Sequence, residues 1–375
     1  MLDDQLIMTP GPTNVPSRIL QAMTKPMINH RGPEFESLYE SIAENLKKTF
    51  ETKNDVYPLS SSGTGGVECA VSNTISTGDK AIVVVNGEFS KRLRDMIKRY
   101  GGDIIELSAE DGQAPSLDEI DSVLEKQQNA RAFFIVYNET ATGVTLRELE
   151  HIGKILKGRE TLFVVDAISI LGGDYLPTDD WNVDICITGS QKCLACPPGL
   201  ALISANEKAM RVVEKNRNPR FYFDLIKIRK YHEDNSTPYT PNLPLFYALQ
   251  EALHLLMEEG LTKRIERHYK HAQQFYDGFE AMGLQILPET KLRSKTVIAV
   301  RNPPGIEDKK IRDSLNQKYG VVIAGGMGST KGKIFRVGNM GIISEREVIT
   351  TLRAIELTLN ELGYKPKQSA PAISR

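Results

Sequence analysis

Lys192 stands at the end of an apolar stretch of chain, in a setting where a lysine loses its proton easily. The run from Val183 to Thr188 is mostly apolar and leads into the turn Gly189-Ser190-Gln191-Lys192, and residues 193–199 carry no charge. Apolar surroundings without a neighbouring acid disfavour the ammonium form of a lysine. A neutral lysine amine can attack a carbonyl group and form a Schiff base, so Lys192 is a candidate nucleophile.

A carboxylate ends a second apolar run upstream of this lysine. The segment Leu162 to Val165 is wholly apolar and is followed by Asp166. Pyridoxal phosphate (PLP) needs an amine for its aldehyde and an acid facing its pyridinium nitrogen. Lys192 and Asp166 together therefore predict a PLP site, although on local sequence alone Asp166 would also suit the N-cap of a helix.

A third segment could hold the phosphate group of such a cofactor. Ser60 to Gly66 is rich in serine and glycine and precedes Val67 to Val71, which is predicted to begin a helix. Backbone N–H groups at a helix N-terminus, joined by short hydroxyl side chains, bind phosphate. No lysine follows the glycines as in a nucleotide-binding P-loop, and the dinucleotide fingerprint is missing. Taken alone, the segment is weak evidence for phosphate, because many Ser/Gly turns only cap a helix.

Short apolar runs between residues 57 and 205 predict the strands of a sheet. These runs are Lys80–Val85, Ala132–Tyr137, Thr161–Val165, Asp184–Thr188 and Leu200–Ser204. Uninterrupted apolar runs are typical of strands covered on both faces, as in a largely parallel sheet flanked by helices. Ligands of such sheets bind beyond the carboxyl ends of the strands, where both Asp166 and Lys192 fall.

The rest of the chain predicts an α/β protein with a large domain and a smaller one. Helical spacing of apolar residues covers about 33–51, 245–259, 262–282 and 348–362, and strands are expected at 296–300, 321–324 and 334–337. The polar, proline-containing stretch 207–242 is expected to be irregular. We expect an N-terminal arm (1–20), a large domain (21–259), a smaller C-terminal α+β domain (260–365) and a disordered tail (366–375).

Composition excludes several other classes of protein. Apolar residues make up 40% of the 375 residues and the formal net charge is −1, so no basic field would attract nucleic acid or an anionic membrane. No apolar run approaches the length of a membrane span, and the acidic start of the chain is unlike a signal peptide; we expect a cytoplasmic protein.

The pair Cys193 and Cys196 could suggest a redox or zinc site, but no second pair of ligands is present, and packing beside the lysine is favoured.

The motifs in their order resemble those of class V aminotransferases, in the alanine–glyoxylate/serine–pyruvate aminotransferase group. The resemblance runs along nearly the whole chain, through Thr9–Pro16, Ser62-Gly63-Thr64, Asn86–Phe89, Glu139–Gly143, Val165–Ala167, Gly189–Lys192, Pro197–Gly199 and Gly332–Gly338. It implies a fold-type-I PLP-dependent transferase. It also implies that Lys192 forms the Schiff base and moves the substrate proton, while Asp166 pairs with the pyridinium nitrogen.

The resemblance also assigns roles to residues around the cofactor and the substrate. It places Phe89 over the cofactor ring and Thr140 near its phenolic oxygen, although periodicity alone favours core packing for Phe89. On the phosphate side it places Ser62, Gly63, Thr64 and Gln191, together with Tyr239 and Thr240, which would reach the cofactor of a neighbouring subunit. Arg336 would bind the substrate carboxylate through its planar donors, and Gly11 belongs to an arm that would close the site.

The resemblance implies a homodimer with shared active sites and a transamination that follows ping-pong kinetics. The expected substrates are a small amino acid, serine or alanine, and a small 2-oxo acid, glyoxylate or pyruvate. A PLP-dependent lyase acting on a small amino acid remains the alternative, and a binding protein that has lost catalysis is a further one. A cysteine desulfurase is disfavoured because Gln191 stands where a histidine is needed. The pair His30-Arg31 is balanced between a phosphate-binding role and a surface role.

Overall fold

The computed structural model describes residues 5–369, and its largest sheet confirms the predicted α/β class. Within these residues the sheet has seven strands in the order β2-β10-β9-β8-β5-β3-β4. The strands are β2 (Val56–Ser60), β3 (Lys80–Val85), β4 (Asp103–Ser108), β5 (Ala132–Val136), β8 (Leu162–Asp166), β9 (Ile185–Gly189) and β10 (Leu200–Ala205). Only β10 runs antiparallel to its neighbours in this sheet, so the carboxyl ends of the other strands share one edge.

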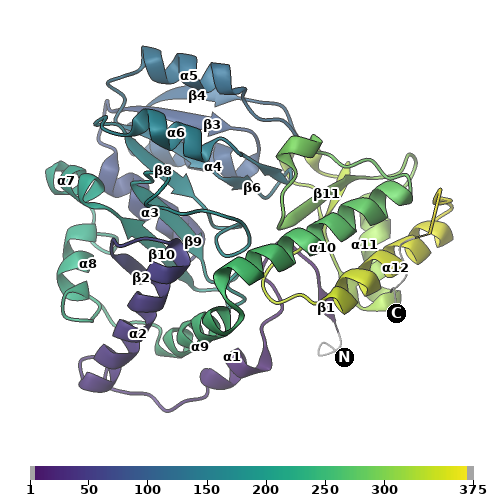
Figure 1. Cartoon of the computed structure of the whole chain (residues 1–375), viewed down its shortest axis with the longest axis horizontal. Coiled ribbons are helices and arrows are strands. Elements are labelled where there is room, and N and C mark those ends of the chain that lie inside the picture. Colours follow the sequence, from purple (N-terminus) through teal and green to yellow (C-terminus); the bar gives the residue numbers. More distant parts are fainter. Residues whose placement is uncertain (1–4, 370–375) are drawn as a thin grey trace.

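Helices cover both faces of this sheet (Figure 1). One face packs against α3 (Gly63–Thr74), α4 (Glu88–Arg99), α7 (Glu207–Lys215) and α8 (Leu225–His232). The other packs against α1 (Ser17–Ala22), α2 (Pro33–Phe50), α5 (Leu117–Lys126), α6 (Leu149–Leu156) and α9 (Leu243–Glu259). Neighbouring strand residues alternate between the two cores, as Ile82 and Val83 do, which explains why the strands are apolar throughout.

A smaller unit follows α9 and lies on the right in Figure 1. It contains α10 (Leu261–Ala281), α11 (Asp308–Tyr319) and α12 (Glu345–Glu361), and an antiparallel sheet β11-β14-β13 made of Val297–Arg301, Ile334–Gly338 and Ala324–Gly325. Short 3-10 turns occupy η2 (Thr290–Leu292) and η3 (Gly328–Thr330). This unit has its own apolar core. Gly260 separates α9 from α10 at the predicted domain boundary, and the division into domains stays a prediction.

The N-terminal arm joins the two units. Its strand β1 (Leu6–Ile7) pairs in parallel with β12 (Val321–Val322) of the smaller unit. The next residues lead back toward the large sheet, where α1 packs beside α9. At the other end of the chain, the backbone N–H groups of Lys367 and Gln368 donate to carbonyls of Met282 and Ala281; residues 370–375 of the predicted tail lie outside the described residues.

One sequence-based prediction is wrong: residues 207–242 are not irregular throughout, because they contain α7 and α8. Each helix begins at a side-chain cap. Asn206 accepts the N–H of Ala209 at 2.9 Å, and Asp224 accepts the N–H of Ile226 at 3.1 Å. Both helices are short, and their few apolar residues are set among many charges, so the apolar period is weak. The three prolines of this stretch lie outside both helices.

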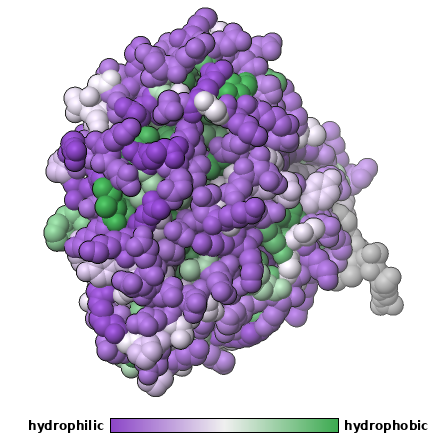
Figure 2. Space-filling view, turned by 60° about the vertical axis from the view of Figure 1, so that its left-hand side comes forward, coloured by the Kyte–Doolittle hydropathy of each residue, from purple (hydrophilic) through white to green (hydrophobic). Residues whose placement is uncertain are grey.

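The surface is mostly hydrophilic, with scattered hydrophobic side chains on the face shown in Figure 2. Among the described residues, no helix combines the length and apolar character that crossing a bilayer requires. A two-residue strand pair, β6 (Asn138–Glu139) and β7 (Val144–Thr145), projects beyond the carboxyl end of β5. The tight turn between these two strands contributes to the site described below.

A buried carboxylate at the amino end of β9 connects the sheet to α7. Asp184 accepts the N–H of Phe163 at 2.7 Å, the ammonium of Lys208 at 2.8 Å and the side-chain amide of Asn206 at 2.8 Å. We predict that Asp184→Ala lowers the free energy of unfolding by about 3 kcal/mol, because three donors lose a buried acceptor. Urea denaturation measures this. The exposed Asp180→Ala should change stability by less than about 0.5 kcal/mol, and equal effects of the two variants would contradict the prediction.

Candidate active site

A pocket at the carboxyl ends of β5, β8 and β9 brings together most of the predicted site residues. Its wall also includes the first turns of α3 and α4. Eight residues singled out from the sequence line it: Ser62, Gly63, Thr64, Phe89, Thr140, Asp166, Gln191 and Lys192. The parallel arrangement of β5, β8 and β9 explains this convergence, since their ends meet at one edge of the sheet.

Lys192 is almost completely enclosed. Only 8% of its surface is exposed, and its ammonium donates a hydrogen bond to the carbonyl of Pro10 in the N-terminal arm. Burial lowers the pKa of Lys192 to about 8; the positive charge of Arg336 acts in the same direction, while Cys193 and Asp166 oppose it. The lowered pKa agrees with the expectation from its apolar sequence neighbours.

The arm approaches this lysine at a glycine. Gly11 adopts φ +86°, and a Cβ atom there would lie 2.5 Å from Cδ and 2.7 Å from Nζ of Lys192. Both the backbone conformation and the lack of space require glycine at this position. Gly11 therefore lies within contact distance of Lys192. This position agrees with the role that the resemblance implied for the arm, which is to close the site.

Asp166 lies in the same pocket as Lys192, at the end of β8. Its carboxylate accepts the N–H of Ile168 at 2.9 Å. Burial raises the pKa of Asp166 to about 7, Glu139 raises it further, and the N–H of Ile168 together with the charges of Lys192 and Arg92 oppose the rise. In the described chain the next element after β8 is the strand β9, so the alternative that Asp166 caps a helix is wrong.

The start of α3 offers donors for an anion. Ser62 caps this helix, since its hydroxyl accepts the N–H of Gly65 at 3.4 Å, and the first N–H groups of a helix have no partner within the helix. Nearby, the side-chain oxygen of Gln191 is buried and has no hydrogen-bond partner among the described residues. An amide nitrogen and oxygen are hard to tell apart in shape, so Gln191 could present its NH₂ group to a phosphate in the same place.

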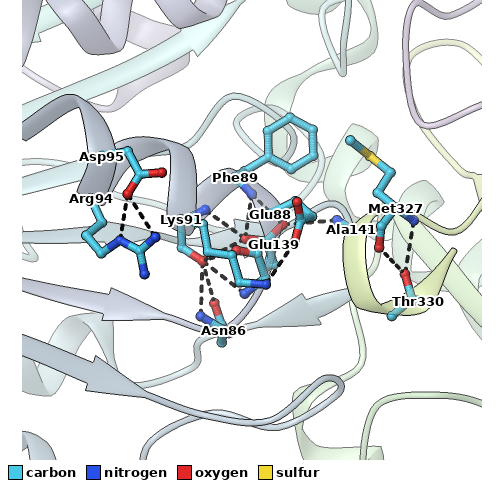
Figure 3. Close-up of polar contacts among 12 residues, drawn as sticks. Asn86, Glu88, Phe89, Lys91, Arg94, Asp95, Glu139, Ala141, Met327 and Thr330 are labelled. Carbon is cyan, nitrogen blue, oxygen red and sulfur yellow. Dashed lines mark hydrogen bonds and ion pairs between the residues drawn. The ribbon is translucent and has the colours of Figure 1, made fainter.

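Glu139 links two segments of the site (Figure 3). Its buried carboxylate accepts the N–H groups of Phe89 at 3.1 Å, Ser90 at 2.9 Å and Ala141 at 3.1 Å. It therefore caps α4, which carries Phe89, and holds the β6–β7 turn, which carries Thr140. Burial raises the pKa of Glu139 and these donors oppose the rise; the charge-assisted bonds fix the relative position of the two segments.

Arg336 extends this linkage into the smaller unit. It lies on β14 with 5% of its surface exposed, and it donates to the carbonyls of Gly325 and Thr140, both at 2.8 Å. Its ion-pair partner is missing: no carboxylate forms a salt bridge with it in the described part of the chain. Burial lowers the pKa of Arg336 to about 10, and Glu139 opposes this. Arg336 does not itself line the pocket of Lys192, but it bonds directly to Thr140, which does.

Tyr239 and Thr240 are not brought to this pocket by their own chain. They line a separate hollow together with Ser60 and Tyr222. The hydroxyl of Tyr239 donates to the carbonyl of Phe221 at 2.7 Å, and its ring stacks on Tyr222 with centroids 5.3 Å apart. A role for these residues at a cofactor requires a second copy of the chain.

Arg31 supports the segment that carries Tyr239. Its guanidinium donates to the hydroxyl of Ser236 at 2.8 Å, to the carbonyl of Thr237 and to that of Pro238 at 3.4 Å. These bonds occupy much of its donor capacity. In a single chain Arg31 therefore stabilises the loop of residues 236–238. This role lies between the two that the sequence left open, which were phosphate binding and a surface position.

The sequence did not single out Glu139, Arg31 or Arg92 for these contacts. Glu139 was noted only as part of a motif, and an isolated glutamate gives no sign of which backbone it will cap. Arg92 had a usable signal: it follows Phe89 by three residues on a helix, so both side chains share one face. That face lines the pocket.

The cysteines are four free, buried thiols. Burial raises the pKa of Cys193 to about 12, and it raises that of Cys196 as well. Raised pKa values leave little thiolate at neutral pH, which disfavours redox chemistry. Among residues 5–369, no group of three or more His, Cys, Asp or Glu side chains is arranged to hold a metal ion.

The pKa of Lys192 predicts how its reactivity depends on pH. Below about pH 8 the amine is protonated and unreactive, and above it the neutral amine predominates. We predict that acylation of Lys192 in the free protein by acetic anhydride, followed by mass spectrometry, rises with a midpoint near pH 8. In Arg336→Gln the midpoint should move upward because a nearby positive charge is removed. A midpoint above pH 10 in the unaltered protein would contradict the assignment.

Comparison with known proteins agrees with this geometry. A family model for class-V aminotransferases matches residues 7–353. An aminotransferase of Methanocaldococcus jannaschii, itself uncharacterised, is 43% identical over 373 residues, which cover 99% of this chain and 97% of the relative. The serine–glyoxylate aminotransferase of Methylorubrum extorquens is 35% identical over 373 residues, covering 96% and 92%.

A solved structure extends the comparison to the fold. The alanine–glyoxylate aminotransferase from Nostoc superimposes with a TM-score of 0.91 at 32% identity, covering 95% of each chain. The family match over residues 7–353 and the superposition of 95% of the chain both extend through the large and the smaller unit. The chain therefore belongs to the class-V aminotransferase family, and it is a PLP-dependent transaminase with the fold-type-I architecture.

Proposed function

We propose that this enzyme transfers the amino group of a small amino acid, serine or alanine, to a small 2-oxo acid, glyoxylate or pyruvate. The relatives described above carry serine, alanine and glyoxylate in their names. The observation that carries the proposal is the placement of Lys192 and Asp166 in one pocket, next to the buried Arg336, which forms no salt bridge among the described residues. Arg336 is suited to the carboxylate that every amino acid and 2-oxo acid substrate shares.

The pocket residues fit PLP. The start of α3 offers backbone N–H groups that suit the phosphate, Gln191 lines the same pocket with a side-chain amide that can donate, and Asp166 suits the ring nitrogen. When bound, PLP supplies an aldehyde that takes up amino groups and a ring that accepts an electron pair. We propose that Lys192 holds the cofactor covalently. Its amine, when released, would take a proton from the substrate α-carbon and return it one carbon away.

The electrostatics of the pocket support these roles. A lysine with a pKa near 8 is neutral in an appreciable fraction at physiological pH, so its amine can act as nucleophile and as base. Asp166 has a raised pKa in the free pocket. A cationic ring nitrogen beside it would favour the carboxylate form, and the pair would keep that ring proton in place.

The lyase reaction that the sequence left open is favoured by no contact in the pocket, and the relatives described above are named as aminotransferases. The two reactions differ in the state in which they leave the cofactor. Transamination converts PLP to pyridoxamine phosphate in the first half-reaction, whereas a lyase restores PLP.

We also propose that two copies of the chain form the active enzyme, with Tyr239 and Thr240 of each copy serving the site of the other. An exposed apolar patch adjoins these residues: Phe221 is 76% exposed, Tyr222 45% and Ile226 42%. Exposed apolar groups of this size next to a hollow are typical of an interface. The cytoplasmic location and the lack of nucleic-acid or membrane partners, expected from composition, stay predictions.

The substrate assignment is tested by a panel of donors and acceptors. We predict that serine or alanine with glyoxylate or pyruvate gives stoichiometric 2-oxo acid, and that one half-reaction yields pyridoxamine phosphate. Arg336→Lys should raise KM for the amino donor by about tenfold, since a point charge replaces a two-point contact, while Arg301→Lys, an exposed change on β11, should not. Recovery of PLP with a deaminated product would instead identify a lyase.

The shared-site arrangement is tested by complementation. Lys192→Ala and the double variant Tyr239→Phe/Thr240→Val should each be inactive or strongly impaired as homodimers. Coexpressed in equal amounts, they should recover about one quarter of the wild-type activity, because half of the dimers then contain one intact site. Activity that does not exceed the sum of the two separate variants would contradict a site built from two chains.

A further inference from the structure

One face of α4 lines the PLP pocket, and that face carries a single charge. The residues that reach the pocket from this helix are Phe89, Arg92, Leu93 and Met96. Their spacing of three, four and seven residues places them on one side of the helix. The other three residues are apolar, so Arg92 is the one charged side chain on this face of the helix.

The guanidinium of Arg92 is directed to the start of α3. Its Nη1 donates to the hydroxyl of Thr64 at 3.4 Å, and its central carbon lies 5.0 Å from the centroid of the Phe89 ring. Cation–π contact with Phe89 restricts the side chain to this direction. Thr64 is the second residue of α3, where backbone N–H groups have no partner within the helix.

Arg92 makes no bond to an acid among the described residues, although its charge acts on Asp166 in the same pocket. In residues 5–369 it forms no salt bridge, whereas Arg94, two positions along the same helix, pairs with Asp95 at 2.8 Å and Glu106 at 3.3 Å. Two sources of positive potential, a helix N-terminus and a guanidinium, thus face the same end of the pocket. An anion at this place would satisfy both.

We propose that Arg92 binds the phosphate group of PLP, an inference that rests on the proposed function of this pocket. The planar fork of a guanidinium matches two phosphate oxygens. The bond would add to those from the first turn of α3, Ser62, Thr64 and Gln191. The carboxylate of the substrate has another candidate partner, Arg336, which approaches from β14 and bonds to the carbonyl of Thr140.

The same residue couples phosphate binding to the ring-stacking position. Because Arg92 lies over Phe89, a guanidinium fixed by the phosphate would also hold Phe89 in place. Phe89 is in turn fixed at its backbone by Glu139. Arg92 is therefore a cofactor-binding residue that contributes to the position of the aromatic side chain.

The test compares PLP with pyridoxal, which lacks the phosphate. Apo-enzyme of wild type, Arg92→Gln, Arg92→Lys and Arg94→Gln is titrated with each compound, and binding is followed by absorbance and by quenching of the single tryptophan. Arg92→Gln should weaken PLP binding by about tenfold or more, because a charge-assisted contact is lost. Its affinity for pyridoxal should change by less than about twofold, and Arg92→Lys should be intermediate for PLP.

The control variant Arg94→Gln should bind both compounds as the wild type does. Unchanged PLP affinity in Arg92→Gln would overturn this inference while leaving the proposed function intact. Equal weakening of PLP and pyridoxal would also overturn it, because the effect would then come from the Phe89 contact alone. A wild type that binds neither compound would overturn the proposed function together with the inference. Should Arg92→Gln fold poorly, the PLP-to-pyridoxal affinity ratio of Arg92→Lys decides in the same way.

Discussion

The burial of one lysine amine is the constraint on which the rest of the site depends. Lys192 would be strongly solvated on a surface, but here the end of β9 and the arm residues Pro10 and Gly11 enclose it. Enclosure lowers its pKa toward neutrality, which makes the amine available as a nucleophile. The arm is held in this place by the pairing of β1 with β12 and by a bond from the N–H of Gly338 to the carbonyl of Met8, both in contact with the smaller unit. The reactivity of a residue in the large unit therefore depends on strand pairing in the other one.

A second linkage runs between the two units through polar contacts. Glu139 fixes the start of α4 and the turn that contains Thr140, and the carbonyl of Thr140 accepts a bond from Arg336 on β14. Gly328 brings the loop after β13 close to Glu88, the first residue of α4; a Cβ atom there would lie 2.1 Å from the carboxylate of Glu88. The elements that carry Phe89, Thr140 and Arg336 are thereby held together. Burial of Glu139 is offset by its donors, so removing its charge would affect several elements together.

The sequence predicted the parts of the site that follow from the ends of apolar strands. Lys192 and Asp166 were expected at one edge of a parallel sheet, and Ser62, Gly63 and Thr64 at the start of a helix beside it; the pocket contains all five.

Contacts made by side chains across the fold could not be predicted. Nothing local indicates that Glu139 caps α4, that Arg31 holds the loop of Tyr239, or that Arg92 makes no bond to an acid. The helices α7 and α8 were missed because their caps, Asn206 and Asp224, stabilise segments whose apolar period is too short to recognise. The antiparallel β10 was also not distinguishable from its parallel neighbours, since burial on both faces gives each the same apolar pattern.

We propose that the enclosed amine of Lys192, and no other lysine, binds the cofactor covalently. Reduction of the enzyme with sodium borohydride after addition of PLP, followed by proteolysis and mass spectrometry of the peptides, tests this. We expect a single reduced pyridoxyl group, located on Lys192 and absent when substrate has first converted the cofactor to its amine form. A label on a different lysine, or labels distributed over exposed lysines with none at Lys192, would contradict it.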